Sequence, residues 1–311
     1  SHMLQGRYML YLYRHLSLAL LGLICLSALI HITPVYADAL VLAQLSDRPK
    51  KDFKQLRPMA KYVASELKSV GITRGEVRLF SELDELTEAV KSGEVHWVTE
   101  TPYSASVLVN EGGAIPLVMK WKSRQKRYQT LIYTHKDSKL TNLGDLVGKR
   151  IAFEHDNSFS SYYLPRLLLN KQGFSVKALD GLKAPLAEDK VNYLFSRNEK
   201  NNLLWVHKRL VDAGALNDGD WENPGRVPDA LKSQLRIIFR SAPYPRALEL
   251  VSPKLSEERA QALKTLLLDM SMESHGKLLS RYEKTDGFEP LTAEVPELLN
   301  EIYTTSRAWN K

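Results

Sequence analysis

The chain has 311 residues, of which 44% are hydrophobic and 25% are charged, a composition typical of a globular protein with one large or two modest domains. Its formal net charge of +7 is a mild excess without one dominant patch, which argues against a nucleic-acid-binding protein. The single cysteine, Cys25, lies in a predicted signal peptide, so the mature chain excludes a disulfide framework, a cysteine nucleophile and a thiolate metal site.

Residues 1–37 predict a tag remnant followed by a secretory signal peptide. Ser1-His2-Met3 is typical of a cleaved expression tag, Arg7 and Arg14 form a basic start, and Leu16 to Ile32 is almost wholly apolar. Val35-Tyr36-Ala37 then offers small residues at a cleavage site. The predicted location is therefore the bacterial periplasm. The alternative is an uncleaved anchor, which would make the protein a membrane-attached interaction module and give it its only contact with the membrane.

Removal of these residues takes away two arginines and no acid, which leaves 41 basic and 36 acidic residues and a net charge of +5. The one dense basic run, KWKSRQKR from Lys120 to Arg127, is interpreted as a solvated loop or helix face. No nucleic-acid partner is predicted.

Strands and helices alternate in the first part of the mature chain. Apolar runs predict strands at residues 39–45, 76–80 and 95–98. Helical spacing of apolar residues predicts helices at about 53–67, after the cap at Ser81 to Asp84, and from about residue 101. This order predicts an α/β domain with a mostly parallel sheet.

The second part of the chain repeats the alternation. Strands are predicted at 116–119, 128–134, 151–153, 175–179, 211–216, 236–240 and 248–251. Helices are predicted from about 158 to 171, over 201–209, after a cap at Ser256, and over 297–309. Two α/β units interleave, because the chain passes between them more than once.

The polar turn from Asp156 to Ser161 joins the strand at Ile151 to Phe153 to the following helix. Asp, Asn and Ser are the residues that cap helix starts, and the free N–H groups and dipole of a first helical turn attract anions. The turn is therefore either an ordinary cap or part of an anion site.

Five segments of the chain stand out as motifs: YQTLIYTHKDS (Tyr128 to Ser138), LGDLVGKRIAF (Leu143 to Phe153), NSFSSYYLP (Asn157 to Pro165), DAGA (Asp212 to Ala215) and RIIFRSAPYP (Arg236 to Pro245). With these motifs the chain resembles, over about residues 40–290, the phosphate/phosphite/phosphonate-binding family of periplasmic solute-binding proteins of ABC importers. The resemblance implies a monomeric, two-lobed type II periplasmic binding protein, each lobe a mostly parallel sheet flanked by helices. Two crossing strands, near Tyr133-Thr134 and Phe239 to Ser241, would join lobe 1 (38–133 plus 241–311) to lobe 2 (134–240).

The resemblance also implies that a ligand is clamped between the lobes and that part of the family's site is replaced. Ser158 and Ser160 match hydroxyls that grip anionic oxygens, but Phe159 stands at a Thr position and Ser161 at a Gly position. Because a phenyl ring cannot replace a hydroxyl donor, the ligand is an open question between a phosphonate and another small oxyanion or organic anion. Tyr128 matches a family tyrosine.

Two further family positions differ. The first-lobe tyrosine falls at Ala105, two residues from Tyr103, and the family's Phe-Ser/Thr-Gly stretch, followed by His-Asp, falls at Phe195 to Glu199, which has no histidine. Arg197 is either a fork for an anionic group or a surface residue paired with Glu199.

The other candidates also have structural alternatives. Arg48 and Tyr103 lie in loops after strands of lobe 1, where cleft residues are expected, and each also has an ordinary structural explanation. Asp218, beside Asn217, either binds a ligand amine or belongs to a turn. Phe159, Tyr162 and Tyr163 either pack in the core or stack on an organic ligand.

No catalytic motif or metal-ligand spacing is present, so we expect no enzyme activity, no metal and no cofactor. The predicted function is delivery of a small anion to an ABC permease. The alternative is a ligand sensor that acts on a membrane sensor kinase of a two-component system, because 47–50 and 83–86 resemble segments of such input modules.

Overall fold

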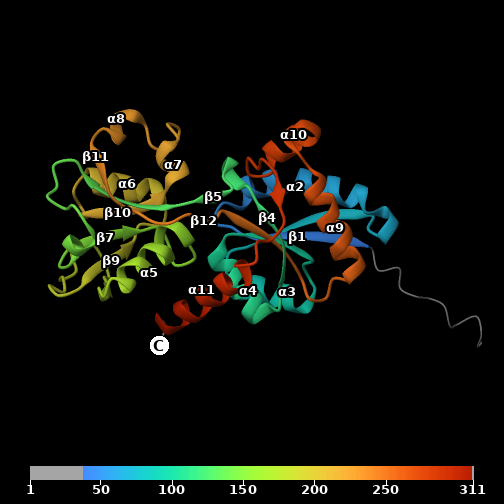
Figure 1. The fold of residues 1–311 in the computed structure, drawn as a ribbon, viewed down its shortest axis with the longest axis horizontal. Helices are drawn as coiled ribbons and strands as arrows, with labels where there is room; N and C mark the ends of the chain where they lie inside the picture. The colour runs from blue at the N-terminus through green and yellow to red at the C-terminus, as the bar shows by residue number, and fades with distance from the viewer. Residues whose placement is uncertain (1–37, 310–311) are drawn as a thin grey trace, which may run out of the picture. The chain divides into compact units, whose positions relative to one another are not determined.

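The computed structural model describes residues 38–309, so the predicted signal peptide and its alternative as an anchor lie outside the described residues. No helix within 38–309 combines the length and the apolar character that a bilayer span requires. Figure 1 shows the described chain as two six-stranded sheets with helices against them.

The first sheet is built around β1, whose apolar run is buried along most of its length. Its strands, in spatial order, are β14 (Phe288–Glu289), β4 (Ile115–Lys120), β13 (Ala247–Val251), β3 (Trp97–Glu100), β1 (Ala39–Leu45) and β2 (Arg74–Phe80). β1 pairs in parallel with β2 and β3, whereas β13 is antiparallel to both of its neighbours. A strand with helices on both faces needs apolar residues on both faces, which explains why β1 reads as a continuous apolar run.

The second sheet has the same arrangement. Its order is β11 (Leu235–Arg240), β6 (Thr130–His135), β10 (Ala213–Asn217), β7 (Arg150–Phe153), β9 (Val191–Phe195) and β8 (Val176–Ala178). β10, β7, β9 and β8 pair in parallel, and β6 is antiparallel to β10 and β11. In each sheet the first strand after the chain arrives from the other sheet, β13 or β6, runs antiparallel to its neighbours.

Two short strands, β5 (Arg127–Tyr128) and β12 (Tyr244–Pro245), link the sheets and pair with each other. Figure 1 shows them between the two six-stranded sheets. The run from residue 128 to 134, predicted as one strand, is divided at Gln129, because Tyr128 pairs with Tyr244 while Thr130 onward pairs within the second sheet. The predicted boundary at residues 133 and 134 falls inside β6.

Helices cover both faces of both sheets. The α-helices are α2 (Pro49–Glu66), α3 (Leu83–Ser92), α4 (Pro102–Gly112), α5 (Leu164–Lys171), α6 (Glu199–His207), α7 (Asp218–Glu222), α8 (Asp229–Lys232), α9 (Glu257–Asp269), α10 (Met272–Arg281) and α11 (Val295–Trp309). Short 3₁₀ turns are η1 (Lys68–Val70), η2 (Lys122–Arg124) and η3 (Leu143–Leu146), and η4 (Phe159–Tyr163) is a π-helix. Ser256 accepts a hydrogen bond from Arg259 N and caps α9 as predicted.

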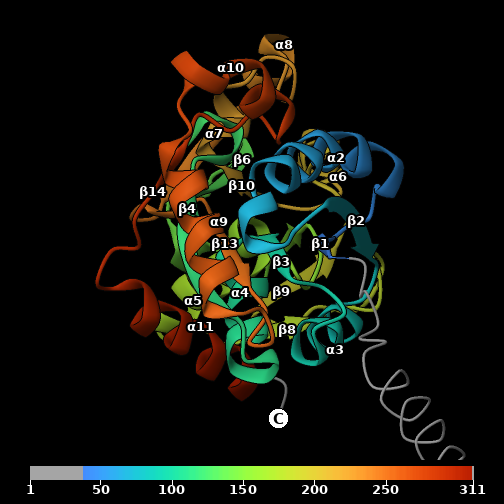
Figure 2. The same ribbon diagram turned by 90° about the vertical axis from the view of Figure 1, so that its right-hand side faces the viewer.

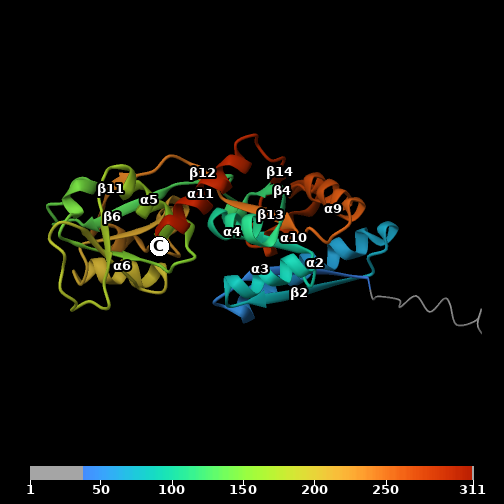
Figure 3. The ribbon, with the colours of Figure 1, turned by 90° about the horizontal axis from the view of Figure 1, so that it is seen from below.

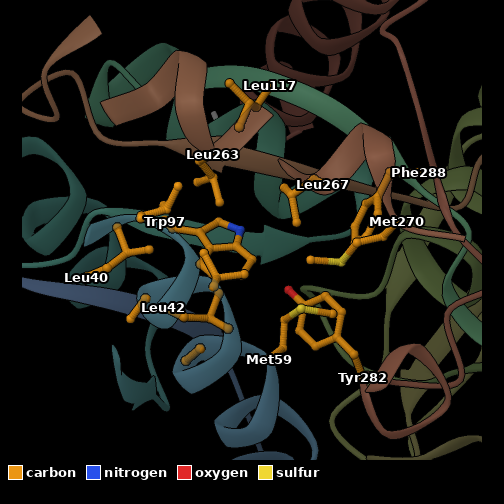
Figure 4. Close-up of a cluster of buried hydrophobic side chains, with 14 of the residues drawn as sticks. Leu40, Leu42, Met59, Trp97, Leu117, Leu263, Leu267, Met270, Tyr282 and Phe288 are labelled. Atoms are coloured by element: carbon orange, nitrogen blue, oxygen red, sulfur yellow. The ribbon is translucent and has the colours of Figure 1, made fainter. Parts of the chain in front are cut away.

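The first sheet separates two apolar cores. Leu40 and Leu42 of β1 face α2, α9 and α10, whereas Val41 and Ala43 face α3, α4 and α11. Figure 2 shows α2 and α3 on opposite sides of the β1–β2 edge, and Figure 4 shows the first core, in which Trp97 and Tyr282 lie among aliphatic and methionine side chains. The second sheet likewise has one core on its α5 face and another on its α6 face.

Two mixed sheets, each with parallel strands flanked by helices and joined through short linking strands, confirm the predicted α/β class.

Candidate functional site

Loops that follow the carboxyl ends of parallel strands meet between the two sheets. A cavity of about 210 Å³ is lined from the first sheet's side by Glu82, Leu83, Asp84 and Tyr103 and from the second sheet's side by Asp156 and Asn157, with Val107, Ser306 and Arg307. The ring centres of Tyr103 in α4 and Tyr163 in η4 are 5.6 Å apart. Such strand ends are where open α/β sheets bind ligands, so a ligand site is expected here.

The charge of this cavity does not suit an anion. Glu82, Asp84 and Asp156 line it, and its one cationic side chain, Arg307, forms an ion pair with Glu111. Burial and the nearby charge of Asp156 both raise the pKa of Tyr103, so its phenol stays neutral and can donate a hydrogen bond. Tyr103 therefore lines a cavity whose acidic side chains repel negative charge.

The turn before η4 folds as a capped helix start. The Ser158 hydroxyl accepts a hydrogen bond from Ser161 N at 3.1 Å, which confirms Ser158 as the cap. The carbonyl of Ser160 accepts a hydrogen bond from the Thr130 hydroxyl, which ties the turn to the strand after the linker. π-Helical turns are rare and are frequent at functional sites, where they shift side chains out of the α-helical register.

The hydroxyl of Ser161 is directed to a carboxyl group. Ser161 Oγ donates to Glu199 Oε1 at 2.9 Å, at the start of α6. Burial raises the pKa of Glu199 well above its usual range, and a hydrogen bond with Asp220 and the charges of Asp220 and Glu154 raise it further. Burial and these neighbours therefore favour the neutral form of Glu199, which lessens its repulsion of an anion.

Asp220 is the ionised partner of Glu199. Burial opposes its ionisation, but the hydrogen bond with Glu199 and the charges of Arg226 and Arg246 outweigh this effect and lower the pKa of Asp220. Asn217 Nδ2 donates to Asp220 Oδ2 at 3.1 Å, and Arg226 Nε lies 3.9 Å from its other oxygen. The opposite pKa shifts of the two carboxyl groups favour a negative charge on Asp220, which these polar and charged side chains stabilise.

Phe159 and Tyr128 belong to an apolar cluster that joins the two sheets. The buried members are Tyr128, Phe159, Tyr163, Leu164, Leu167 and Ile302, which we call the junction cluster. The rings of Phe159 and Tyr128 are 5.9 Å apart, and Phe159 stacks on Tyr163 at 5.7 Å. Phe159 is 2% exposed, so its packing within the protein accounts for its position.

The remaining predicted residues lie apart from this cluster. The side chain of Arg48, at the start of α2, is 51% exposed and lies 3.5 Å from Asp47 and 4.0 Å from Asp52. Arg197 is exposed and has a left-handed backbone with φ of 83°. Glu199 bonds to Ser161 rather than to Arg197.

Asp218 Oδ1 lies at the linkers. It accepts hydrogen bonds from the backbone N–H of Gln129 at 2.9 Å and from Gln125 Nε2 at 3.2 Å. With these contacts Asp218 holds the segment on either side of the linker strand β5 in place.

The sequence did not indicate three polar residues of this region as site residues. They are Asp220, Arg246 and Glu199, the last of which bonds to Ser161. The sequence signal for Glu199 was its place in the stretch where the family has a histidine. The signal for Arg246 was a lone charge at the head of the apolar strand 247–251. Within residues 38–309, no group of three or more His, Cys, Asp or Glu side chains is arranged to hold a metal ion.

The chain is similar to known binding proteins over most of its length. The family model for "ABC transporter, phosphonate, periplasmic substrate-binding protein" matches residues 43–295. A structure of XAC2383 from Xanthomonas citri bound to chloride ion has a TM-score of 0.82 and 32% identity, covering 87% of this chain and 98% of that chain. A second structure of that protein, bound to ATP, gives a TM-score of 0.81, 31% identity and the same coverage.

A second relative is PhnD1 from Prochlorococcus marinus (strain MIT 9301), described as a probable ABC transporter phosphite binding protein. It is 24% identical over 178 residues, which are 53% of this chain, and the chain spans 57% of the length of this curated relative. Its structure in complex with methylphosphonate has a TM-score of 0.66 and 18% identity, covering 88% of this chain and 99% of that chain, a likeness in fold.

The chain therefore belongs to the family of periplasmic phosphonate-type substrate-binding proteins of ABC transporters. This membership confirms the family that the sequence motifs indicated. The family's description as a substrate-binding protein also supports the prediction that the chain is not an enzyme.

Proposed function

We propose that the protein binds a small phosphorus oxyanion between its two sheets and delivers it to the permease of an ABC importer. The observation that carries this proposal is the meeting of Tyr128, at the end of β5, with the capped turn of η4 at the carboxyl ends of the second sheet's strands. Membership of the family supports the transport role. Two relatives with structures bound to ATP or methylphosphonate support an oxyanion of phosphorus as the ligand class.

The mechanism is closure of the two sheets' loops on the anion. The hydroxyls of Ser158 and Ser160 are buried at the start of η4, where N–H groups and the helix dipole favour negative charge. Burial favours the neutral form of Glu199, which lessens the repulsion of an anion at the turn. Closure then removes water from the bound anion, which strengthens each of its hydrogen bonds.

A thermal-shift screen tests the proposal on the wild-type protein. The probes are phosphate, phosphite, methylphosphonate, ATP, methanesulfonate and acetate, and a ligand at a hundred times its Kd adds about 2.7 kcal/mol to the stability. We expect the phosphorus oxyanions to give the largest shifts. Stabilisation by none of the phosphorus compounds would contradict the proposed function.

Substitution of Ser158 then tests the turn. We expect Ser158→Ala to weaken binding of the best probe by about 1.5–3 kcal/mol, the range for a lost hydrogen bond to a charged group. Ser65→Ala is the matched control, because the Ser65 hydroxyl is exposed and bonds only to the carbonyl of Tyr62 in its own helix. Equal affinity in Ser158→Ala and the wild type would remove Ser158 from the site.

A further inference from the structure

Arg246 lies in an unusual place for an arginine. It is 8% exposed and is the only buried arginine within residues 38–309. It stands between β12 and β13, directly after the linker on which the two sheets are joined. A buried charge is costly unless it is paired. The groups that surround the Arg246 guanidinium therefore indicate whether the protein or a ligand pairs with it.

The protein satisfies the Arg246 guanidinium only in part. Its Nε donates to Gln125 Oε1 at 3.2 Å, and its central carbon lies 4.6 Å from the centre of the Tyr128 ring. Among the described residues no carboxylate comes within the 4.0 Å of an ion pair with it, and its two terminal nitrogens have no hydrogen-bond partner. Guanidinium groups carry five N–H donors in a planar fork, so most of this fork is unused.

Nearby carboxyl groups do not supply the missing partner. The positive charge of Arg246 helps to lower the pKa of Asp220, but the contacts of the Asp220 carboxylate are with Asn217 at 3.1 Å and Arg226 at 3.9 Å. Asp218 accepts hydrogen bonds from the Gln129 backbone and from Gln125. The positive charge at Arg246 is therefore incompletely neutralised by the fold.

The Tyr128 hydroxyl provides a second, independent observation. Tyr128 is 2% exposed, and its hydroxyl has no hydrogen-bond partner among residues 38–309. Buried tyrosine hydroxyls usually find a partner. Tyr128 of β5 pairs with Tyr244 of β12, and Tyr244 lies two residues before Arg246. The Tyr128 hydroxyl and the Arg246 guanidinium therefore both lie at the paired linkers that join the two sheets.

We propose that Arg246 and Tyr128 hold one anionic group of the ligand at the joint between the two sheets. This inference rests on the proposed function and names the charge that the sequence motifs left unassigned. Where the family has a hydroxyl, Phe159 donates no hydrogen bond, and its ring packs 5.9 Å from Tyr128. The fork of Arg246 supplies donors in its place, next to the phenol of Tyr128. Planar two-oxygen recognition suits a phosphonate or phosphate group.

Isothermal titration of methylphosphonate and inorganic phosphate into four proteins tests the inference. In Arg246→Gln the affinity falls about 10- to 100-fold, the effect of a lost hydrogen-bonded charge. Arg246→Lys keeps the charge without the fork and recovers part of that loss. The control is Arg150→Gln, an arginine of β7 away from the linkers whose side chain donates only to the carbonyl of Ala184 at 3.5 Å, and it binds like the wild type.

The outcomes separate this inference from the proposed function. If neither probe binds to the wild type, the proposed function is contradicted. If Arg246→Gln binds with wild-type affinity, only the proposed site at Arg246 and Tyr128 is overturned. If Arg246→Gln does not fold, as judged by circular dichroism, Tyr128→Phe carries the test, because it keeps the ring under Arg246 and removes only the hydroxyl. A loss of about 5- to 10-fold in Tyr128→Phe supports the site, and unchanged affinity overturns it.

Discussion

Glu249 of β13 is a fully buried carboxyl group in the first sheet. Trp97 Nε1 donates to one of its oxygens at 2.6 Å and the Tyr282 hydroxyl to the other at 2.9 Å. Figure 4 shows these two side chains next to each other in the core. Burial raises the pKa of Glu249 to about 7, against the opposing effect of the Lys120 charge.

Lys120 forms an ion pair in this core with another carboxylate. Its Nζ lies 2.7 Å from Glu283 and 3.9 Å from Glu249, and the charges of Lys120 and Lys122 overcome burial and hold the pKa of Glu283 well below its usual value. Lys120 is fully buried, so the interpretation of KWKSRQKR as a solvated run is wrong for its first residue. The side chain is buried because β4 lies inside the sheet, between β13 and β14.

The raised pKa of Glu249 predicts that the protein loses stability as the pH rises. Between about pH 4.5 and pH 7 the folded state holds a proton that the unfolded state releases, so the free energy of unfolding falls through that window by up to about 3 kcal/mol from this group. Glutamine is a neutral isostere of the protonated form. We therefore expect Glu249→Gln to gain stability relative to the wild type from pH 5 to pH 8.

Urea unfolding of both proteins at pH 5 and pH 8 measures this gain. The control is Glu188→Gln, at an exposed carboxyl group in the loop before β9, which should leave the difference between the two pH values unchanged. A Glu249→Gln effect of the same size at both pH values would mean that Glu249 does not change its ionisation in this range.

At the scale of elements, the turn from β9 into α6 contains an arginine whose backbone has the left-handed conformation that favours glycine. Arg197 has φ of 83°, and its N–H donates to the carbonyl of Glu154 at 2.8 Å. The family resemblance implies a glycine at this position. A left-handed backbone costs a residue with a Cβ atom about 1 kcal/mol or more, and glycine avoids this cost. Glycine in turn lowers the stability somewhat, because it increases the entropy of the unfolded chain.

We expect Arg197→Gly to raise the free energy of unfolding by about 0.5–1 kcal/mol, since relief of the strain exceeds the entropy cost. Arg197→Ala is the control, because it removes the same exposed side chain and keeps the Cβ atom. Chemical denaturation of the two variants distinguishes the causes. A similar gain in both would assign the effect to the arginine charge, and weaker ligand binding in both would place Arg197 in the site.

Elements with strong sequence patterns could be predicted, and those set by pairing between distant segments could not. The apolar run of β1 and the cap at Ser158 are local signals, and both are confirmed. The division of residues 128–134 depends on whether each residue pairs with β12 or with the second sheet, which no local pattern records. The π-helical turn of η4 likewise has no residue signature of its own.

The candidate site follows the same division. Ser158, Ser160 and Tyr128 could be proposed from the sequence because they stand in motifs that resemble those of a family. Arg246 and Glu199 could not be assigned from spacing, because their importance depends on burial and on partners far along the chain, such as Gln125 and Ser161. A single charge at the head of an apolar strand is a weak signal until its burial is known.

At the scale of the whole described chain, α11 connects the two sheets independently of the linkers. It packs on α4 of the first sheet's side, and its last turn reaches the second sheet's η4 and α5, as Figures 1 and 3 show. The ring of Trp309 lies 5.1 Å from that of Tyr163 and 4.5 Å from the Arg166 guanidinium. An ion pair of 3.4 Å between Lys171 and Glu301 supports the same contact.

Because the junction cluster and Trp309 hold the two sides together, α11 should limit how far they separate without ligand. We expect Trp309→Ala to weaken this contact by about 1–2 kcal/mol, less than for a fully buried tryptophan, and so to populate more separated conformations. Small-angle scattering of the ligand-free protein should then give a larger radius of gyration. Methylphosphonate, at saturation, should restore the wild-type value, since a ligand that contacts both sides favours the closed form.

Tyr303→Ala provides the matched control, because the Tyr303 ring lies on the same helix and contacts the Arg307 guanidinium of that helix at 5.2 Å. It should scatter like the wild type. The apparent affinity of Trp309→Ala should also fall, in proportion to the smaller fraction of molecules that are already closed. Identical scattering and affinity in Trp309→Ala and the wild type would mean that the linkers, through β5, β12 and the junction cluster, set the relation of the two sheets without α11.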